Sequence, residues 1–312
     1  MNQTTKKNRR EFLRMTRNAL FTTMAAPMIV PRSVLGGEGA VAPSDRIAMG
    51  FIGLGNMGNG HIFGESWTYL PGGYLARSDV QILAVSDVWK EKQEKTRDKI
   101  NLFYSRKYGQ GKFPSCEVYS DFRQLLARKD IDAVLIATPI HWHSTMTVLA
   151  AQAGKDVYCE KPTSVTLHEA KAMAKAIADN KRIFQAGTQQ RSEYEGRFYK
   201  VCELVRNERI GKLKEVYAFS DGGGAQWLKE TGKELPIPEG FDWDLWLGPA
   251  PKIPFDGRAD AHLFGTGGIN WGQHHYDFVQ WVLDADRTGP VELFIDNEHA
   301  AYRYANGVVV YG

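Results

Sequence analysis

The sequence has 312 residues, which is long enough for two domains and a sizeable hydrophobic core. Apolar residues make up 43% and charged residues 24% of it, values that are ordinary for a soluble globular protein. The formal net charge of +3 is too small to indicate a nucleic-acid-binding protein, and part of it lies in the first 17 residues. We therefore expect no nucleic-acid partner.

The N-terminus has the order of a signal peptide, with basic residues up to position 17 and a mildly apolar stretch at 19–30. Arg9 and Arg10, followed by Phe-Leu and a further arginine, resemble the twin-arginine export signal. The alternative is a basic amphipathic helix on a cytosolic protein. Export implies that residues 1–45 are signal and linker, that the twin-arginine translocase is a transient partner, and that the enzyme is periplasmic or otherwise extracytoplasmic. The apolar stretch is shorter than the roughly 20 residues of a membrane span, so we expect no membrane anchor after processing.

The chain has three cysteines, at Cys116, Cys159 and Cys202. They are far apart in the sequence and odd in number, so they indicate neither a disulfide framework nor a metal site. We expect them to be packing residues.

A glycine-rich loop follows the first predicted strand. Residues 47–52 form a short apolar run that predicts a buried strand, and a G-x-G-x-x-G sequence comes directly after it. The first glycine of such a loop allows a tight turn, the second lets backbone approach a pyrophosphate, and the third lets the next helix pack on the strand. Amides at the start of that helix would point at the phosphates. The predicted dinucleotide-binding residues of the loop are Gly53, Gly55, Asn56, Met57 and Gly58.

An acidic residue ends the second predicted strand, which covers 80–85. Asp87 lies further from Gly58 than the usual roughly 20 positions, because residues 71–79 are inserted before the strand. A carboxylate there can accept the ribose hydroxyls and would repel a 2′-phosphate, which favours NAD over NADP. The alternative is a helix N-cap. Lys92 lies close by in the sequence, so NADP stays open.

Helical and strand patterns alternate from residue 46 to residue 187, which predicts an α/β doubly wound Rossmann domain with a parallel sheet. The predicted helices are 57–69, stopped by the Pro71-Gly72-Gly73 sequence, then 90–108, 121–128 after a Ser120 cap, 140–153 and 166–180; the further strands are 133–137, 156–159 and 182–186.

At these residues the chain resembles the glucose–fructose oxidoreductase and inositol dehydrogenase family, often written Gfo/Idh/MocA. The motifs are the glycine loop, Thr-Pro with a following His, and the sequence Ala-Gly-Lys-Asp-Val-Tyr-Cys-Glu-Lys-Pro. Two further stretches, ending at Arg191 and Pro249, are similar to a subgroup of exported sugar oxidoreductases. The resemblance implies cofactor contacts at Thr138, Pro139, His143, Glu160, Lys161 and Pro162.

Lys161 is the first candidate catalytic residue. The carboxyl end of a strand in an open α/β sheet faces the ligand crevice, so a lysine there meets whatever lies against the nicotinamide. The family resemblance implies a cis bond between Lys161 and Pro162 that aims the amine at the substrate hydroxyl. A surface lysine at a strand end is the alternative.

A second catalytic group is predicted on a helix that begins near residue 269. Asn270, His274 and Asp277 share one face of that helix. The resemblance implies an Asp-x-x-x-His motif in which the His is the general acid–base, and here Asn270 replaces the Asp. Asparagine can hydrogen-bond a hydroxyl or orient the imidazole, but it cannot carry a proton at neutral pH. His275 is turned by about 100° and is a candidate for substrate contact or for packing elsewhere.

Further substrate contacts are predicted in the second half. Gln190 and Arg191 follow the last Rossmann strand, and Arg191 is expected either to bind a carboxylate or hydroxyls, or to pair with Glu193 or Glu195. Trp243, like the tryptophans at 227 and 246, is a candidate for stacking on a sugar face, with buried packing as the alternative. We expect no metal, since adjacent histidines point apart on a helix.

Residues 188–312 predict a substrate-binding α+β domain with an open, mostly antiparallel sheet. Residues 212–220 alternate like a strand, and a hairpin is predicted around Asn306-Gly307. The second sheet of relatives continues beyond such a hairpin, so we expect a truncated chain. An open sheet face in relatives usually dimerises, which implies a homo-oligomer.

The sequence thus indicates an exported NAD(P)-dependent oxidoreductase that transfers hydride between a pyranose or pyranoside hydroxyl and the nicotinamide. An NAD-dependent redox glycosidase and a sugar–sugar hydride shuttle with tightly bound cofactor are alternatives. A non-catalytic NAD-binding protein stays open because of Asn270 and the short C-terminus.

Overall fold

The computed structural model describes residues 45–65, 70–111, 113–192, 194–218, 232–259, 264 and 269–312. The twin-arginine segment, Glu193 and Trp227 lie outside the described residues. The predictions made for them are therefore not addressed by the fold.

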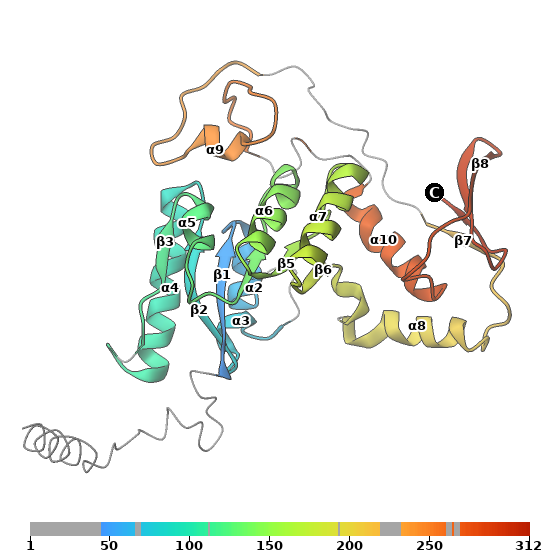
Figure 1. Cartoon of the computed structure of the whole chain (residues 1–312), viewed down its shortest axis with the longest axis horizontal. Coiled ribbons are helices and arrows are strands. Elements are labelled where there is room, and N and C mark those ends of the chain that lie inside the picture. Colours follow the sequence, from blue (N-terminus) through green and yellow to red (C-terminus); the bar gives the residue numbers. More distant parts are fainter. Residues whose placement is uncertain are drawn as a thin grey trace, which may run out of the picture. The chain divides into compact units, whose positions relative to one another are not determined.

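The first sheet is parallel and has six strands in the order β3-β2-β1-β4-β5-β6. This is the strand order of a dinucleotide-binding Rossmann sheet, with the ligand crevice at the carboxyl ends of β1 and β4, where the order reverses. The prediction of a doubly wound α/β domain is confirmed (Figure 1). The strands are β1 (Ile47–Ile52), β2 (Val80–Ser86), β3 (Glu117–Tyr119), β4 (Ala133–Ile136), β5 (Asp156–Glu160) and β6 (Phe184–Gly187).

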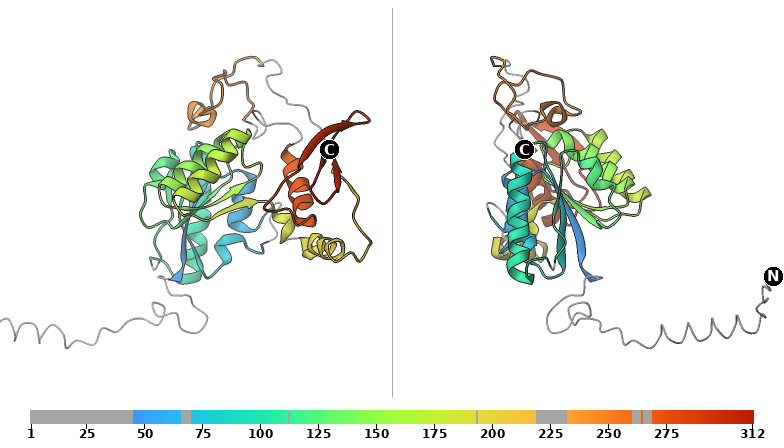
Figure 2. Two further views of the ribbon diagram at one scale, coloured as in Figure 1. Left: turned by 45° about the vertical axis from the view of Figure 1, so that its right-hand side comes forward. Right: turned by 90° about the vertical axis from the view of Figure 1, so that its left-hand side faces the viewer.

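Helices cover both faces of this sheet (Figure 2). One apolar core joins a face of the sheet to helices α2, α3 and α4, through side chains such as Ile62, Leu75 and Ile100. The other core joins the opposite face to α5 and α6, through Leu125 and Met146. The helices are α2 (Asn56–Phe63), α3 (Gly73–Ala76), α4 (Lys90–Tyr108), α5 (Phe122–Leu126), α6 (Ile140–Gln152) and α7 (Leu167–Asp179).

Two predicted helix boundaries in this half are wrong. Helix α2 ends at Phe63 rather than near residue 69, because Gly64 adopts the left-handed conformation that terminates helices. The residues from 71 onward do not stop it; they lead into the separate short helix α3. At α5 the N-cap is Asp121, whose carboxylate accepts the Arg123 amide at 2.9 Å, and not Ser120.

The second half contains a four-stranded sheet in the order β7-β10-β9-β8. Strands β8, β9 and β10 pair antiparallel and β7 pairs parallel to β10, so the predicted open, mostly antiparallel sheet is confirmed. The predicted hairpin around Asn306-Gly307 is present between β9 and β10. These strands are β7 (Glu215–Tyr217), β8 (Glu292–Asp296), β9 (His299–Arg303) and β10 (Val309–Tyr311).

Three α-helices and two 3₁₀ turns complete the described part of the second half. Helix α10 carries the predicted His274, and α9 lies in the Trp-rich stretch. All three cysteines of the chain are buried and none forms a disulfide. Among the described helices, none has the length and apolarity needed to cross a membrane. The elements are η3 (Gln189–Arg191), η4 (Tyr194–Gly196), α8 (Arg197–Arg206), α9 (Trp243–Leu247) and α10 (Ile269–Val282).

Candidate active site at the carboxyl edge of the parallel sheet

The glycine loop at the end of β1 has the geometry that a dinucleotide needs. Gly53 has φ of 89°, and a Cβ there would lie 2.6 Å from the Ala137 carbonyl oxygen. A Cβ on Gly58 would lie 1.9 Å from the Gly53 oxygen, so the helix packs against the loop only without a side chain. A Cβ on Gly55 would meet nothing within 4 Å, which leaves room for a ligand at the middle glycine. The three glycines therefore fit the turn, the approach and the packing that a pyrophosphate site requires.

Helix α2 begins at Asn56, directly after this loop, and its N-cap Gly55 offers no side chain to its first amides. Asn56 and Met57 line a cavity of about 980 Å³, called the larger cavity below. No acidic residue lies in the first turn of α2. The helix start is thus suited to an anion, because unpaired amides and the positive end of the helix dipole meet there.

Asp87 follows β2 and lines a second cavity of about 190 Å³, called the smaller cavity. Its Oδ2 accepts the Leu54 amide at 2.7 Å and its Oδ1 accepts the Trp89 amide at 2.9 Å. Burial raises the pKa of the Asp87 carboxyl. Trp89, and not Asp87, is the N-cap of α4. Asp87 therefore holds the glycine loop against the end of β2 at the edge of the cavity, with Lys92 among the other lining residues.

The two cavities share lining residues, Thr138 among them. Pro139 lines the smaller cavity and His143 the larger one. The buried His143 ring lies between two backbone oxygens, with Nδ1 2.7 Å from that of Pro162 and Nε2 2.7 Å from that of Thr138. His143 thus ties the end of β4 to the turn after β5, which places Lys161.

Glu160 at the end of β5 is buried, lines the larger cavity and has partners that the sequence did not suggest. Its Oε1 lies 2.6 Å from His61 Nε2 and accepts the Gln189 side-chain amide at 2.7 Å. Its Oε2 accepts the Lys161 amide at 3.2 Å. Glu160 therefore connects α2, β5 and η3 below the catalytic candidate.

Lys161 and Asn270 meet in the larger cavity. The Lys161–Pro162 bond is cis, as the family resemblance implies. Lys161 Nζ donates to Asn270 Oδ1 at 2.6 Å and to the Asn270 backbone oxygen at 3.1 Å. Burial lowers the pKa of the Lys161 amine. The neutral Asn270 amide holds the amine in place, and the charge of Glu160 opposes the effect of burial by favouring the protonated amine.

His274 lies one helical turn after Asn270 and lines the same cavity. Its side chain is buried, and its Nδ1 has no hydrogen-bond partner in the described part of the chain. Burial, followed by the charge of Lys161, lowers the pKa of His274 to about 4. The imidazole is therefore neutral at pH 7 and able to accept a proton.

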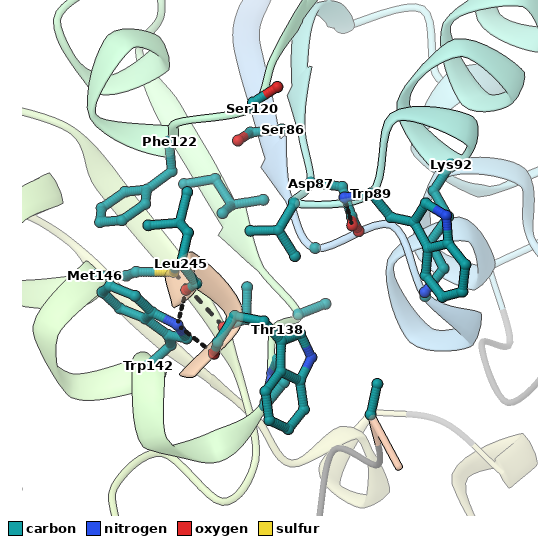
Figure 3. A pocket seen from close by; sticks show the side chains of 18 of the residues that line it. Ser86, Asp87, Trp89, Lys92, Ser120, Phe122, Thr138, Trp142, Met146 and Leu245 are labelled. Atoms are coloured by element: carbon teal, nitrogen blue, oxygen red, sulfur yellow. Dashed lines mark hydrogen bonds between the residues drawn. The ribbon is translucent and has the colours of Figure 1, made fainter. Parts of the chain in front are cut away.

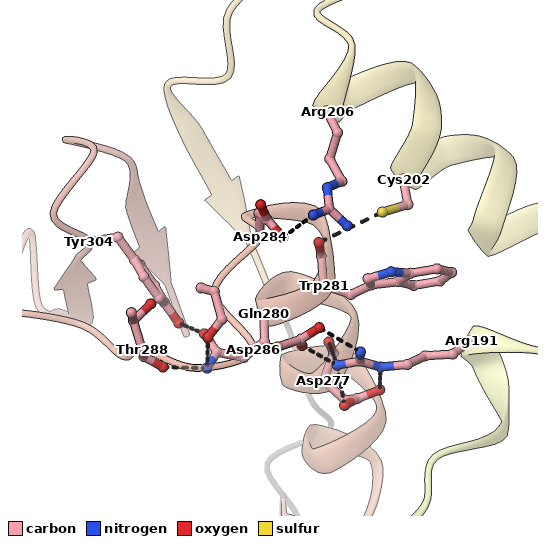
Figure 4. Close-up of polar contacts among 11 residues, drawn as sticks. Arg191, Cys202, Arg206, Asp277, Gln280, Trp281, Asp284, Asp286, Thr288 and Tyr304 are labelled. Atoms are coloured by element: carbon pink, nitrogen blue, oxygen red, sulfur yellow. Dashed lines mark hydrogen bonds and ion pairs between the residues drawn. The ribbon is translucent and has the colours of Figure 1, made fainter.

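Asp277, the third predicted member of that helix face, does not join the other two. Its carboxylate forms a two-pronged ion pair with Arg191, in which Nε–Oδ2 and the second nitrogen–oxygen distance are both 2.8 Å (Figure 4). Arg191 also pairs with Asp286 at 2.7 Å. Neither Arg191 nor Asp277 is among the residues that line the larger or the smaller cavity. In the structure Arg191 and Asp277 anchor η3 to α10, and the substrate role expected for Arg191 and the catalytic role expected for Asp277 stay predictions.

The other predicted substrate residues are not among those that line the larger cavity. Trp243 is buried, stacks on Trp246 with ring centroids 4.6 Å apart, and donates its indole N–H to Ile253, so it is a packing residue. Gln190 is buried, with its side-chain oxygen lacking a partner among the described residues. His275 is partly buried and lines neither cavity.

No sequence pattern marks Gln189 and His61, which contact Glu160, or Trp271, which lines the cavity beside Lys161. The lysine Nζ lies 5.4 Å from the centroid of the Trp271 ring. The only signal in the sequence was that Gln189 and Trp271 are adjacent to predicted site residues, Gln190 and Asn270. In the described ranges, no group of three or more His, Cys, Asp or Glu side chains is placed to hold a metal ion.

Comparison with known proteins gives the same picture for both halves. Residues 47–188 match the NAD-binding Rossmann domain of the Gfo/Idh/MocA oxidoreductase family, and residues 216–308 match that family's C-terminal alpha/beta domain. Solved structures with the same fold include myo-inositol 2-dehydrogenase from Lactobacillus plantarum, with a TM-score of 0.52, 18% identity, and coverage of 85% of this chain and 68% of that one. An NAD-binding protein from Listeria innocua has a TM-score of 0.55 and 20% identity, over 85% and 66% of the two chains.

Among curated relatives, the uncharacterized oxidoreductase YrbE of Bacillus subtilis is 29% identical over 78% of this chain, which spans only 55% of that protein. Inositol 2-dehydrogenase of Rhizobium meliloti is 24% identical over 85% of this chain and 73% of its own length. Glycosyl hydrolase family 109 proteins of Shewanella baltica are 31% identical over 49% of this chain and 30% of theirs. With both domains matched and a glycine loop that fits a dinucleotide, the chain belongs to the Gfo/Idh/MocA family of oxidoreductases with an NAD(P)-binding Rossmann domain.

Proposed function

We propose that this oxidoreductase acts on a secondary hydroxyl of a six-membered sugar ring, a pyranose or pyranoside. The observation that carries the proposal is the meeting of Lys161, Asn270 and His274 in the cavity that the glycine loop also lines. A lysine amine and a neutral imidazole can supply the acid and the base that help to oxidise an alcohol. The similarity to inositol 2-dehydrogenase supports a polyhydroxylated ring as the substrate class.

The chain's own residues divide the work as follows. The loop from Gly53 to Gly58 and the first amides of α2 hold the pyrophosphate, and bound NAD(P) supplies the hydride acceptor at its nicotinamide ring. Neutral His274 takes the proton of the substrate hydroxyl. The Lys161 ammonium donates a hydrogen bond to the substrate oxygen as negative charge develops there, and Asn270 keeps the amine aimed into the cavity.

Replacement of Lys161 tests this proposal. Lys161→Ala should lower kcat by about 10²–10⁴-fold, the usual contribution of a positioned acid or base, with little change in the Kd for NADH. Lys175→Ala is the matched control, because Lys175 is an exposed lysine on α7 that pairs only with Asp179 in the described structure. The assay follows nicotinamide reduction over a panel of pyranoses, pyranosides and cyclitols. Full activity of Lys161→Ala would contradict the catalytic role assigned to Lys161.

A second candidate is an NAD-dependent redox glycosidase, and the similarity to glycosyl hydrolase family 109 proteins favours it. Transient oxidation at C3 of a glycoside would acidify the proton at C2, so that the aglycone is eliminated from C1; water then adds at C1, a proton returns to C2, and hydride returns to C3. Release of nitrophenol from a nitrophenyl glycoside, without net NADH formation, would identify this activity. Net NADH formation with a free sugar indicates a plain dehydrogenase, and sugar-dependent reduction of a second sugar indicates a hydride shuttle. Nucleotide binding with no turnover on any substrate indicates a non-catalytic protein.

We propose the extracytoplasmic location on the sequence of residues 9–14. Replacing Arg9 and Arg10 together by lysine should keep the protein in the cytoplasmic fraction, whereas an unchanged periplasmic fraction would contradict twin-arginine export.

The proposed homo-oligomer rests on the exposed apolar side chains Leu293 and Ile295 of β8. Light scattering of the purified protein measures its mass directly, and a monomer would contradict this proposal.

A further inference from the structure

We propose that residues 240–248, called the cap segment below, form a wall of the adenosine site and set the rate at which NAD(P) dissociates. The cap segment belongs to the second half of the chain, beyond the residues that match the NAD-binding domain. The inference rests on the nucleotide site of the proposed function, but it concerns cofactor retention and not the reaction.

The smaller cavity has the position and the lining of an adenosine site. It lies beyond Asp87, at the carboxyl end of β2, where the ribose of a dinucleotide binds in Rossmann sheets. Its walls are largely apolar and aromatic, which suits a flat base that binds by stacking (Figure 3). Gly55 and Thr138 line both cavities, so one extended ligand can reach from the adenosine site into the catalytic cavity.

The cap segment supplies one side of that cavity through Phe241, Leu245 and Trp246. Its first part pairs with the three residues that follow Asp87. The Lys90 amide donates to the Gly240 oxygen at 2.9 Å, and the Asp242 amide donates to the Val88 oxygen at 2.9 Å. The rings of Trp89 and Phe241 stack between these bonds, with centroids 4.9 Å apart. The cap segment is thereby fastened next to the Asp87 carboxylate.

The second part of the cap segment is fastened to the start of α6. The Trp142 indole N–H donates to the backbone oxygens of Leu245 and Trp246, each at 3.0 Å (Figure 3). The buried His141 ring lies with Nε2 2.9 Å from the same Trp246 oxygen. Burial lowers the pKa of His141 to about 4, so the neutral ring donates through Nε2. A Cβ on Gly248 would come within 2.0 Å of the Trp142 ring, which shows how closely the two chain segments pack.

These contacts join the cap segment to the Rossmann half at two separate places, with the smaller cavity between them. A base bound in that cavity would be enclosed by groups held by backbone hydrogen bonds and buried aromatic packing. For the adenosine end to leave past the cap segment, at least one of the two fastenings must open. Dissociation of the nucleotide should therefore be slow, and it should become faster when a fastening is weakened.

His141 offers a clean test, since its side chain lines neither cavity. His141→Ala removes one hydrogen bond to Trp246, and His141→Gln is the matched control that keeps a donor. We expect the dissociation rate of NADH, measured by stopped-flow after mixing the complex with excess NAD, to rise about tenfold in His141→Ala and less than threefold in His141→Gln.

Fragments of the cofactor locate the effect. In His141→Ala the affinity for AMP should fall, while the affinity for nicotinamide mononucleotide should stay within twofold of the wild type. Equal loss of both affinities would mean that the whole site has loosened, and an unchanged NADH dissociation rate in a folded His141→Ala protein would equally overturn the inference. Absence of sugar turnover with the expected dissociation rates would contradict the proposed function and leave this inference standing.

Discussion

Lys161 contacts a neutral amide where the family resemblance implies a carboxylate, so the residue at position 270 adds no negative charge beside its buried amine. The amine donates to Asn270 Oδ1 at 2.6 Å, and burial lowers its pKa. An amide oxygen aligns the amine but offers far less stabilisation of its charge than a carboxylate does. The ammonium is therefore lost at a lower pH than that of an exposed lysine.

Asn270→Asp should reverse this effect. A carboxylate at that position favours the ammonium, so the pKa of Lys161 rises. Because the protonated lysine supports the reaction, the alkaline fall in kcat/KM should move to higher pH, by about one unit or more. The measurement is the pH profile of kcat/KM for both proteins, with Asn270→Ser as a control that adds no charge. An alkaline limb that stays in place in Asn270→Asp would contradict the assigned protonation state.

The glycine loop allows a folding requirement to be separated from a ligand requirement. Gly58→Ala brings a Cβ within 1.9 Å of the Gly53 oxygen, so it should lower the free energy of unfolding by about 1–3 kcal/mol or more. Gly55→Ala meets open space in the described structure, so it should leave the free energy of unfolding within about 0.5 kcal/mol and weaken NADH binding at least tenfold. Urea unfolding and NADH titration of both variants check these outcomes. Comparable destabilisation by both changes would show that Gly55 is also a structural residue.

At the scale of elements, helix α10 depends on an arginine that comes from another part of the chain. Arg191 in η3 holds Asp277 of α10 and also Asp286 after the helix, and it lowers the pKa of Asp286. The two-pronged geometry fixes the helix in rotation as well as in position. Since Asn270 and His274 lie on the same helix, the ion pair positions both of them relative to Lys161.

Arg191→Met should therefore lower kcat about tenfold or more, with a smaller loss of stability, about 1–2 kcal/mol, because both partners are partly exposed to solvent. Asp286→Asn is the matched control: it removes only the more exposed partner and should have less than half of each effect. The decisive reading is the alkaline limb of the pH profile, which should shift in Arg191→Met because the surroundings of Lys161 change. A loss of stability alone would reduce Arg191 to a purely structural residue.

At this scale the sequence predicts well the bounds of helices that neighbouring residues determine. The bounds of α4 match the prediction of 90–108, and α7 begins after Thr166, which forms a capping box with Glu169. The three-residue strand β3 was missed because so short a segment shows no periodicity. The partners of Arg191 and Glu160 were missed because residues distant in the chain provide them, and no spacing rule connects Arg191 to Asp286 or His61 to Glu160.

At the scale of the whole molecule, nucleotide binding should stabilise both halves together. The smaller cavity takes its walls from the Rossmann half and from the cap segment, so a ligand there contacts groups that are far apart in the chain. NADH at about 100 times its Kd should raise the free energy of unfolding by about 2.7 kcal/mol, in a single thermal transition. Calorimetry with and without NADH measures this. A second thermal transition whose midpoint NADH does not shift would show that the second half unfolds separately from the Rossmann half.

The fastening of the cap segment to Val88 and Trp142 also bears on engineering with this chain. A designer who joins residues 47–188 to the substrate domain of a relative would cut between the two matched regions. In such a chimaera a loop from the relative would lie against the Trp142 indole in place of Leu245. The Lys90 amide would also lose its acceptor, the Gly240 carbonyl oxygen. The unit to transplant with the nucleotide half is therefore discontinuous in the sequence, and it includes the stretch from Gly240 to Gly248.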